Sequence, residues 1–132
     1  LAALYKRYQC SIIAIEEVPA EDTGSYGIIS GEEIAPGIFQ VRDMVEKPNP
    51  EDAPSNLAII GRYILTPEIF TYLRNTKPGA NGEIQITDAL KSLAQDRQVL
   101  AVKFKGRRFD CGSVDGFIEA TNYYYENVYK KN

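Results

Sequence analysis

The sequence predicts an α/β fold: a mixed, mostly parallel sheet flanked by helices, with a small antiparallel hairpin. Three observations predict it. Two segments, residues 12–15 and 57–65, are apolar on both faces, as are strands buried from both sides. Helix-start signals alternate with these strands. Residues 26–47 contain two short strand-like runs separated by a glycine-containing connection. The length of 132 residues fits one domain, residues 1–132.

The chain begins with the predicted end of a helix. Apolar side chains recur at helical spacing in residues 1–8. A buried strand is expected from Cys10 to Val18. A helix leading into a buried strand is the second half of a βαβ unit, so we expect the first strand to lie in a preceding segment.

The antiparallel hairpin is predicted between residues 26–29 and residues 39–47. Ile28 and Ile29 would face the stretch from Val41 to Val45. Gly27, near the start of the first strand, is typical of a close approach between backbone and ligand. A turn or bulge glycine is an equal alternative at this position.

Two helices are predicted after the strand at residues 57–65. The first begins at Thr66-Pro67-Glu68, with a hydroxyl cap, a proline at the first position and an early acid, and ends near Asn75. Its expected buried residues are Ile69, Phe70 and Leu73. A loop is expected from residue 77 to 82. Thr87 is predicted to cap the second helix, whose buried residues are Leu90 and Leu93.

The C-terminal part is predicted to be a strand, a turn and a helix. The strand covers residues 99–104. Ser113 is the expected N-cap of a helix over residues 114–129 with one apolar stripe. The stripe comprises Val114, Phe117, Ile118, Thr121, Tyr124, Tyr125 and Val128.

Composition excludes several classes of function. The chain has no histidine, which excludes Ser/His and Cys/His nucleophiles and histidine-ligated metals. Phosphoryl and nucleotidyl transfer remain, because positioning and cations do most of the work there. A net charge of −3 without a basic stripe argues against nucleic acid as a partner. We interpret the basic cluster in residues 103–108 as a solvated strand edge and turn.

Membrane insertion and disulfide bonding are not expected. No apolar run has the length of a membrane span. Cys10 and Cys111 are far apart in the sequence and form no C-x-x-C motif. Reduced thiols fit a reducing compartment, so we expect a cytoplasmic protein.

The stretch Val45-Glu46-Lys47-Pro48 is the principal candidate site. Neighbours in a regular strand point to opposite faces, so Glu46 and Lys47 can bind one ligand only where the strand ends. Pro48 supplies that end because it lacks an N–H for pairing. A carboxylate accepts hydrogen bonds from sugar hydroxyls, and an ammonium suits a phosphate. The pair therefore predicts a sugar-phosphate site; an ordinary surface pair at a strand end is the alternative.

Several segments in order resemble one family, the bacterial UTP–glucose-1-phosphate uridylyltransferases, also called UDP-glucose pyrophosphorylases. The resemblance covers essentially the whole chain and fits the C-terminal part of a nucleotide-diphospho-sugar transferase fold. The matching segments are Tyr26-Gly27-Ile28-Ile29, Val45-Glu46-Lys47-Pro48, Pro54 to Tyr63, Pro78-Gly79 with Gly82 to Asp88, and Asp110-Cys111-Gly112.

The resemblance implies roles for particular residues. Glu46 would bind the glucose hydroxyls, and Lys47 the sugar phosphate, which makes Lys47 the expected catalytic residue. Gly27 and Ile59 would present main-chain groups to the sugar. Asp110 would bind Mg²⁺, the implied cofactor; a turn or helix-entry acid is the alternative for this aspartate. The implied reaction converts UTP and glucose 1-phosphate into UDP-glucose and pyrophosphate.

The sequence also departs from the family. The family's glycine-rich nucleotide loop, Gly-x-Gly-x-x-Arg, does not occur here. We therefore expect a C-terminal half that lacks the N-terminal, nucleotide-binding half and is inactive alone. We also expect a homo-oligomer that associates through the first helix and residues 12–15. The alternatives are a stand-alone sugar-phosphate-binding or regulatory module and a purely structural α/β domain.

Overall fold

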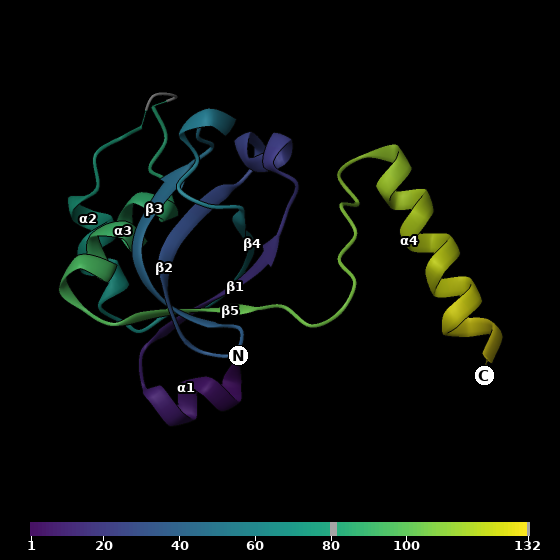
Figure 1. The fold of residues 1–132 in the computed structure, drawn as a ribbon, viewed down its shortest axis with the longest axis horizontal. Coiled ribbons are helices and arrows are strands. Elements are labelled where there is room, and N and C mark those ends of the chain that lie inside the picture. The colour runs from purple at the N-terminus through teal and green to yellow at the C-terminus, as the bar shows by residue number, and fades with distance from the viewer. Residues whose placement is uncertain (80–81, 132) are drawn as a thin grey trace.

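Five strands close into a barrel in the part of the chain that the structure describes, residues 1–79 and 82–131. The computed structural model is shown in Figure 1. The order around the barrel is β1-β4-β2-β3-β5. The strands are β1 (Ser11–Glu17), β2 (Gly27–Ala35), β3 (Ile38–Glu46), β4 (Leu57–Ile64) and β5 (Val99–Lys103).

The expected mixed sheet is confirmed, but the expectation that it is mostly parallel is wrong. Among the described strands, β1 and β5 form the parallel pair, and the other neighbours pair antiparallel. A parallel pair needs a long crossover, whereas a short connection reverses the chain. β2 and β3 are joined by a tight turn, so these two strands run in opposite directions. β4 also pairs antiparallel with both of its neighbours, β1 and β2.

The predicted hairpin is confirmed as β2 and β3. Ile28 lies opposite Val45, and Ile29 lies opposite Met44. The strands meet at a turn where Gly37 has a φ of 72°, a conformation that glycine adopts without a steric penalty. β2 is longer than predicted, whereas β3 begins and ends one residue earlier than predicted. Both strands belong to the barrel, so the hairpin is not a separate small unit.

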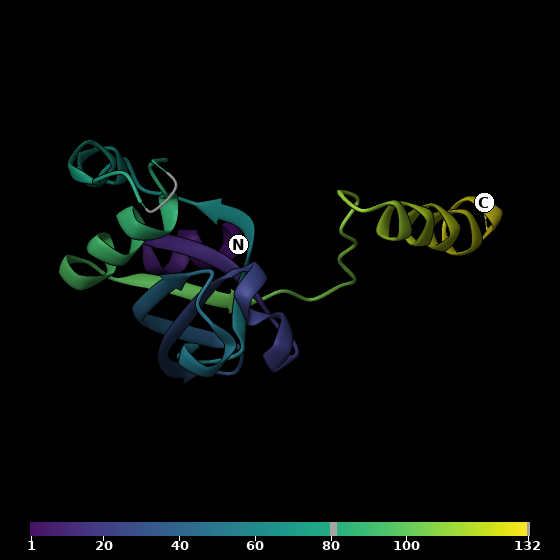
Figure 2. The same ribbon diagram turned by 90° about the horizontal axis from the view of Figure 1, so that it is seen from above.

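Helices flank the barrel, as the sequence predicts. α1 (Ala2–Tyr8) lies against β1, whereas α2 (Ile69–Asn75) and α3 (Ile86–Asp96) pack on each other. α3 covers β3, and Figures 1 and 2 show α2 and α3 on the same side of the barrel. The remaining helices are α4 (Val114–Asn127) and the short 3₁₀ turns η1 (Ala20–Ser25), η2 (Pro50–Asp52) and η3 (Tyr129–Lys131).

Helix starts differ from prediction at two of three positions. Ser113 caps α4, because its hydroxyl accepts a hydrogen bond of 3.1 Å from the N–H of Gly116. Thr66 instead lies in a turn before α2, and Thr87 is the second residue of α3. The hydroxyl of Thr87 has a long-range partner in place of a capping role, described below. Phe70, expected to be buried, is 61% exposed.

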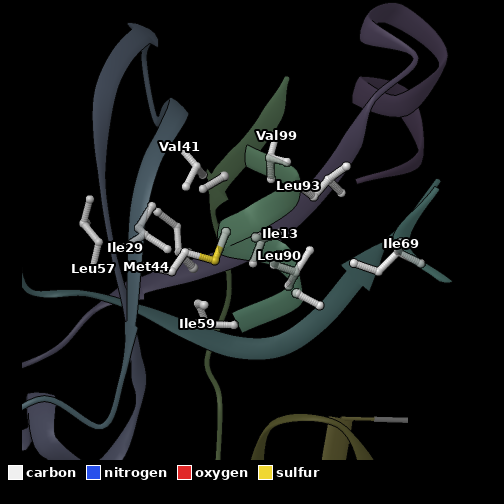
Figure 3. Packing of buried hydrophobic residues seen from close by; sticks show 13 residues of the cluster. Ile13, Ile29, Val41, Met44, Leu57, Ile59, Ile69, Leu90, Leu93 and Val99 are labelled. Atoms are coloured by element: carbon white, nitrogen blue, oxygen red, sulfur yellow. The ribbon is translucent and has the colours of Figure 1, made fainter. Parts of the chain in front are cut away.

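The main core lies between the barrel strands and the helices α2 and α3 (Figure 3). Its labelled side chains come from strands and helices that are far apart in the sequence. The whole stretch from Ile12 to Ile15 is buried. This strand therefore cannot supply the exposed surface through which association was expected. In the loop predicted at residues 77–82, residues 80 and 81 lie outside the described residues.

α4 extends away from the barrel at the end of an extended segment (Figures 1 and 2). The predicted apolar stripe is present but exposed. Val114 is 76% exposed and Phe117 is 59% exposed. Its members Ile118, Tyr124, Tyr125 and Val128 are exposed as well, and the exposed Tyr129 follows them. None of the described helices combines the length and apolarity that crossing a membrane requires.

Candidate functional site

Glu46 is the last residue of β3 and is half-buried. Oε2 of its carboxylate accepts a hydrogen bond of 2.6 Å from the hydroxyl of Thr87. Thr87 is only 4% exposed, and it sits in the first turn of α3, the helix that covers β3. The buried hydroxyl of Thr87 therefore holds one carboxylate oxygen of Glu46 in place by a hydrogen bond.

The backbone changes direction at Lys47. Its φ of 46° lies in the left-handed region, which few residues other than glycine adopt. The N–H of Lys47 donates a hydrogen bond of 2.9 Å to the carbonyl of Tyr26, and Pro48 follows. The predicted strand end is confirmed. Because the chain turns here, Glu46 and Lys47 do not point to opposite faces of a regular strand.

A cavity of about 210 Å³, which we call the Glu46 cavity, opens beside the carboxylate. Three of the predicted substrate-binding residues, Gly27, Glu46 and Ile59, line it together. Its other lining residues are Ser25, Tyr26, Gly61, Tyr63, Gln85, Ile86 and Thr87. One carboxylate and several hydroxyl, amide and main-chain groups therefore converge on a small concave space, which suits a polar ligand.

Gly27 is closely packed at this cavity. A β-carbon at Gly27 would lie 3.0 Å from Oε2 of Glu46 and 3.1 Å from Cδ1 of Ile59. It would also lie 3.3 Å from the hydroxyl oxygen of Thr87. A side chain at this position would therefore displace Glu46, Ile59 or Thr87 by a few tenths of an ångström. These contacts are between protein atoms, so the approach of a ligand to the backbone of Gly27 stays a prediction.

Electrostatics link Glu46 to Tyr63. Burial, and secondly the negative charge of Glu46, raise the pKa of Tyr63 above its ordinary value. The phenol therefore keeps its proton at neutral pH and can donate a hydrogen bond within the Glu46 cavity. Tyr63 comes from β4, so strands β2, β3 and β4 all contribute to the site.

A second cavity of about 410 Å³, the Lys47 cavity, adjoins the first. Glu46 and Gln85 line both cavities. The second also contains Lys47 and, from α3, Lys91. Lys91 forms an ion pair of 3.0 Å with Asp43. Two ammonium groups therefore line this cavity together with the carboxylates of Glu46 and Asp88, so a phosphate would be bound by direct contact with a lysine and not by a net positive charge.

The structure does not bring Asp110 to these cavities. Asp110 is exposed, and it lines a separate cavity of about 440 Å³ whose polar lining includes Arg62, Arg107 and Arg108. Its Oδ1 accepts a hydrogen bond of 3.0 Å from the N–H of Gly112, within the turn that precedes α4. Glu46, Lys47 and Asp110, to which the resemblance gives roles in one reaction, therefore do not line one pocket, and the metal-binding role of Asp110 stays a prediction.

The described residues do not by themselves fit a magnesium site. Mg²⁺ prefers several oxygen ligands in octahedral geometry. Asp110 is one carboxylate beside three arginines, and no group of three or more acidic, cysteine or histidine side chains gathers anywhere in residues 1–79 and 82–131.

Sequence reasoning missed Thr87, Tyr63 and Lys91 as site residues. The sequence predicts Thr87 as a helix cap, because a hydroxyl before an apolar run is a local signal, whereas its contact with Glu46 is not local. Lys91 follows Thr87 by four residues, so both lie on one face of α3. A helical-spacing argument from Thr87 would have found Lys91 if the role of Thr87 had been known.

Comparison with known sequences gives one consistent result. A family model described as "Nucleotidyl transferase" matches residues 2–127. UTP–glucose-1-phosphate uridylyltransferase of Pseudomonas aeruginosa strain PAO1 is 65% identical over 130 residues, which is 98% of this chain and 47% of the relative. The same-named protein of Streptococcus pyogenes is 48% identical over 118 residues, 89% of this chain and 39% of the relative.

Solved structures agree with the sequences. A UDP-glucose pyrophosphorylase complexed with UDP-glucose matches 94% of this chain and 47% of that chain, with a TM-score of 0.90 and 61% identity. A UTP-bound UGPase from Acinetobacter baumannii matches 96% and 44%, with a TM-score of 0.78 and 35% identity. The chain thus spans about half the length of the relatives it matches. These shares do not support the expected C-terminal placement, and the matches do not favour a stand-alone module.

Proposed function

The chain belongs to the nucleotidyl transferase family, and on that basis we propose that it forms the sugar-phosphate-binding part of an enzyme that makes UDP-glucose and pyrophosphate from UTP and glucose 1-phosphate. The observation that carries the proposal is the pair of adjoining cavities that meet at Glu46. One offers hydroxyl-binding groups, and the other offers two lysines beside the carboxylates of Glu46 and Asp88.

Glu46 and Lys47 divide the recognition of glucose 1-phosphate between them. The carboxylate of Glu46, held by Thr87, has a free oxygen with which to accept hydrogen bonds from sugar hydroxyls. Gly27 and Ile59 shape the wall against which the sugar lies. Lys47, turned out of the strand by its left-handed backbone, lies at the mouth where the phosphate would sit. The proposal therefore keeps Gly27, Glu46, Lys47 and Ile59 as substrate-binding residues.

The proposed reaction joins two anions. A phosphate oxygen of glucose 1-phosphate attacks the α-phosphorus of UTP, a new P–O bond forms, and the bond from the α-phosphorus to the leaving pyrophosphate breaks. The attacking oxygen is already ionised at neutral pH, so no general base is needed. Lys47 offsets the repulsion between the two reactants and stabilises the charge of the transition state, which makes it the catalytic residue in this proposal.

Lys91 strengthens the positive field at the same place. It lines the Lys47 cavity from α3, although its ion pair with Asp43 offsets part of its charge. Lys47 has the left-handed backbone and the direct position beside Glu46, so it is the better candidate for phosphate contact. Mg²⁺ is part of the proposal for the whole enzyme, and Asp110 remains its candidate ligand, but no step above depends on the metal.

We also propose that the chain alone does not turn over. It spans about half of its relatives, and its sequence contains no glycine-rich nucleotide loop. Self-association is proposed through the exposed stripe of α4 in place of the buried stretch 12–15. A cytoplasmic location is proposed because Cys10 and Cys111 are free thiols, which a reducing compartment maintains.

The test is a chimaera in which this chain replaces the 130 matched residues of the Pseudomonas aeruginosa relative. At 65% identity the interface with the remaining sequence should be retained. We expect pyrophosphate release that requires both UTP and glucose 1-phosphate. The chain alone, assayed with both substrates and Mg²⁺, should release none.

Two results would contradict the proposal. A folded chimaera without turnover would refute the assignment of the reaction. Sustained turnover by the 132-residue chain alone would refute the proposed inactivity of the isolated chain.

A further inference from the structure

Arg108 connects the C-terminal segment to the barrel. Its Nε donates a hydrogen bond of 2.6 Å to Glu16 of β1, and its Nη2 donates one of 2.9 Å to the hydroxyl of Tyr26. The guanidinium carbon also lies 5.5 Å from the centre of the Tyr26 ring. The side chain of Arg108 therefore forms an ion pair with a carboxylate, a hydrogen bond with a tyrosine hydroxyl and a cation–π contact with the ring of the same tyrosine.

This anchor is partly shielded from water. The side chains of Arg108 and Glu16 are 29% and 24% exposed, the least exposed of the ion pairs among the described residues. Beyond residue 104, the hydrogen bonds that reach the barrel in residues 1–79 and 82–131 all come from Arg108. The neighbouring Arg107 pairs with Glu119 of α4, so it makes no such connection.

Tyr26 carries this contact to the proposed substrate site. Tyr26 is one of the residues that line the Glu46 cavity, its side chain packs against the buried cluster of Val18, Ile28 and Ala58, and Gly27 follows it in the chain. Its carbonyl accepts the hydrogen bond of 2.9 Å from Lys47. Tyr26 is thus held by Arg108 at its hydroxyl end, while its main chain fixes the backbone turn that presents Lys47.

We propose that Arg108 is a positioning residue for the sugar-phosphate site, acting through Tyr26 on the Gly27 wall and on the backbone of Lys47. The proposal rests on the function proposed above. Arg108 itself need not touch the substrate. Its contribution is to hold Tyr26 in one orientation. The cavity is then formed, and the phosphate-binding lysine is in position, before glucose 1-phosphate binds.

The first experiment needs no substrate and uses the 132-residue chain. Amide hydrogen exchange at Lys47 reports the bond to the Tyr26 carbonyl, because local opening exposes that amide. Arg108→Met should accelerate exchange at this amide by about tenfold, the loss of roughly one charge-assisted hydrogen bond. Arg107→Met, the matched control, should leave it unchanged. Equal exchange in Arg108→Met and the unaltered chain would overturn the proposal.

The second experiment measures Michaelis constants in the chimaera. Arg108→Met should raise KM for glucose 1-phosphate by about tenfold and leave KM for UTP unchanged. Tyr26→Phe, which removes only the hydroxyl, should have a similar effect, and the two changes together should not add. Arg108→Lys should restore part of the loss because it keeps the charge.

The outcomes separate this inference from the proposed function. A chimaera with Arg108 intact but without turnover contradicts the proposed function, while the exchange experiment still decides whether Arg108 controls Lys47. A working chimaera in which Arg108→Met changes neither constant, or changes both equally, refutes the positioning role alone. Full additivity with Tyr26→Phe would show that Arg108 does not act through Tyr26.

Discussion

The hydroxyl of Thr87 donates a hydrogen bond of 2.6 Å to Oε2 of Glu46, which joins the first turn of α3 to the last residue of β3. The two residues are 41 positions apart in the sequence. This bond holds the carboxylate that we assign to the sugar hydroxyls. Removing the hydroxyl of Thr87 should therefore affect both the position of this carboxylate and the binding of the sugar.

Thr87→Val should weaken substrate binding and lower the stability of the fold by similar free energies. Valine has nearly the same shape but no hydroxyl, so one oxygen of Glu46 loses a buried donor. We expect a loss of about 1–2 kcal/mol in the free energy of unfolding of this chain. In the chimaera we expect a rise of about tenfold in KM for glucose 1-phosphate. Urea titration and steady-state kinetics measure the two effects.

Thr87→Ser is the matched control, because it keeps the hydroxyl. It should retain KM within about twofold of the unaltered chimaera, in line with the small effect of a conservative change. Equal effects of serine and valine would show that the methyl group of Thr87 matters and the hydrogen bond does not.

Gly27→Ala should reduce the space available to the sugar. The added carbon would lie 3.0 Å from Glu46 Oε2 and 3.1 Å from Ile59 Cδ1, both at the ends of side chains that can move. We therefore expect a folded protein, with a stability loss of about 1–3 kcal/mol from overpacking. KM for glucose 1-phosphate in the chimaera should rise.

A second substitution tests the steric cause directly. Ile59→Val removes the Cδ1 atom that the alanine would approach, so it should recover part of the binding lost in Gly27→Ala. If Ile59→Val worsens the defect, the crowding explanation is wrong.

Stability should fall at high pH because of Tyr63. Burial and the charge of Glu46 raise its pKa above the ordinary value of 10.0. Between the ordinary and the raised pKa, the folded chain keeps a proton that the unfolded chain releases. The contribution to stability is complete below pH 10.0 and is lost as pH rises through the folded-state pKa.

Urea titrations at about pH 8 and about pH 11 measure this effect. Tyr63→Phe should lose less stability over that interval than the unaltered chain. Tyr129→Phe is the control, because Tyr129 is 72% exposed. An identical decline in all three proteins would contradict the prediction.

The exposed stripe of α4 should drive self-association. Phe117 is 59% exposed and Ile118 is 51% exposed, and contiguous apolar side chains on a soluble protein mark a contact surface. We expect light scattering to detect dimers or larger species at high concentration. Phe117→Asp should shift the chain towards monomer without lowering its thermal midpoint.

Ile34→Asp is the comparison variant for this prediction. Ile34 is 41% exposed but lies on β2, away from α4. Its replacement should leave association unchanged. A monomer at all concentrations, or equal effects of the two variants, would exclude α4 as the contact.

Local sequence signals predicted the elements well and their arrangement less well. Pro48 marked the end of β3, and Ser113 marked the start of α4, because each acts on its own backbone. The mostly antiparallel pairing was missed, since strands buried on both faces occur in parallel sheets and in barrels alike. Phe70 was wrongly placed in the core because helical spacing does not specify where a short helix is covered.

The site was predicted only in part, because local sequence signals identify adjacent residues but not contacts between distant elements. Glu46 and Lys47 are adjacent, so a local argument about the strand end was enough. Thr87 and Tyr63 join them only because α3 and β4 fold beside β3, and no spacing in the sequence encodes that contact. Asp110 does not meet them in the structure, although the family resemblance groups the three.

The most direct measurement of the central claim is the pair of Michaelis constants of the chimaera carrying Lys47→Ala. If Lys47 binds the phosphate of the sugar, KM for glucose 1-phosphate rises by about tenfold or more, kcat falls, and KM for UTP stays unchanged. A variant whose KM for glucose 1-phosphate is unaltered, or whose defect lies in UTP alone, would show that the cavities meeting at Glu46 are not the sugar-phosphate site.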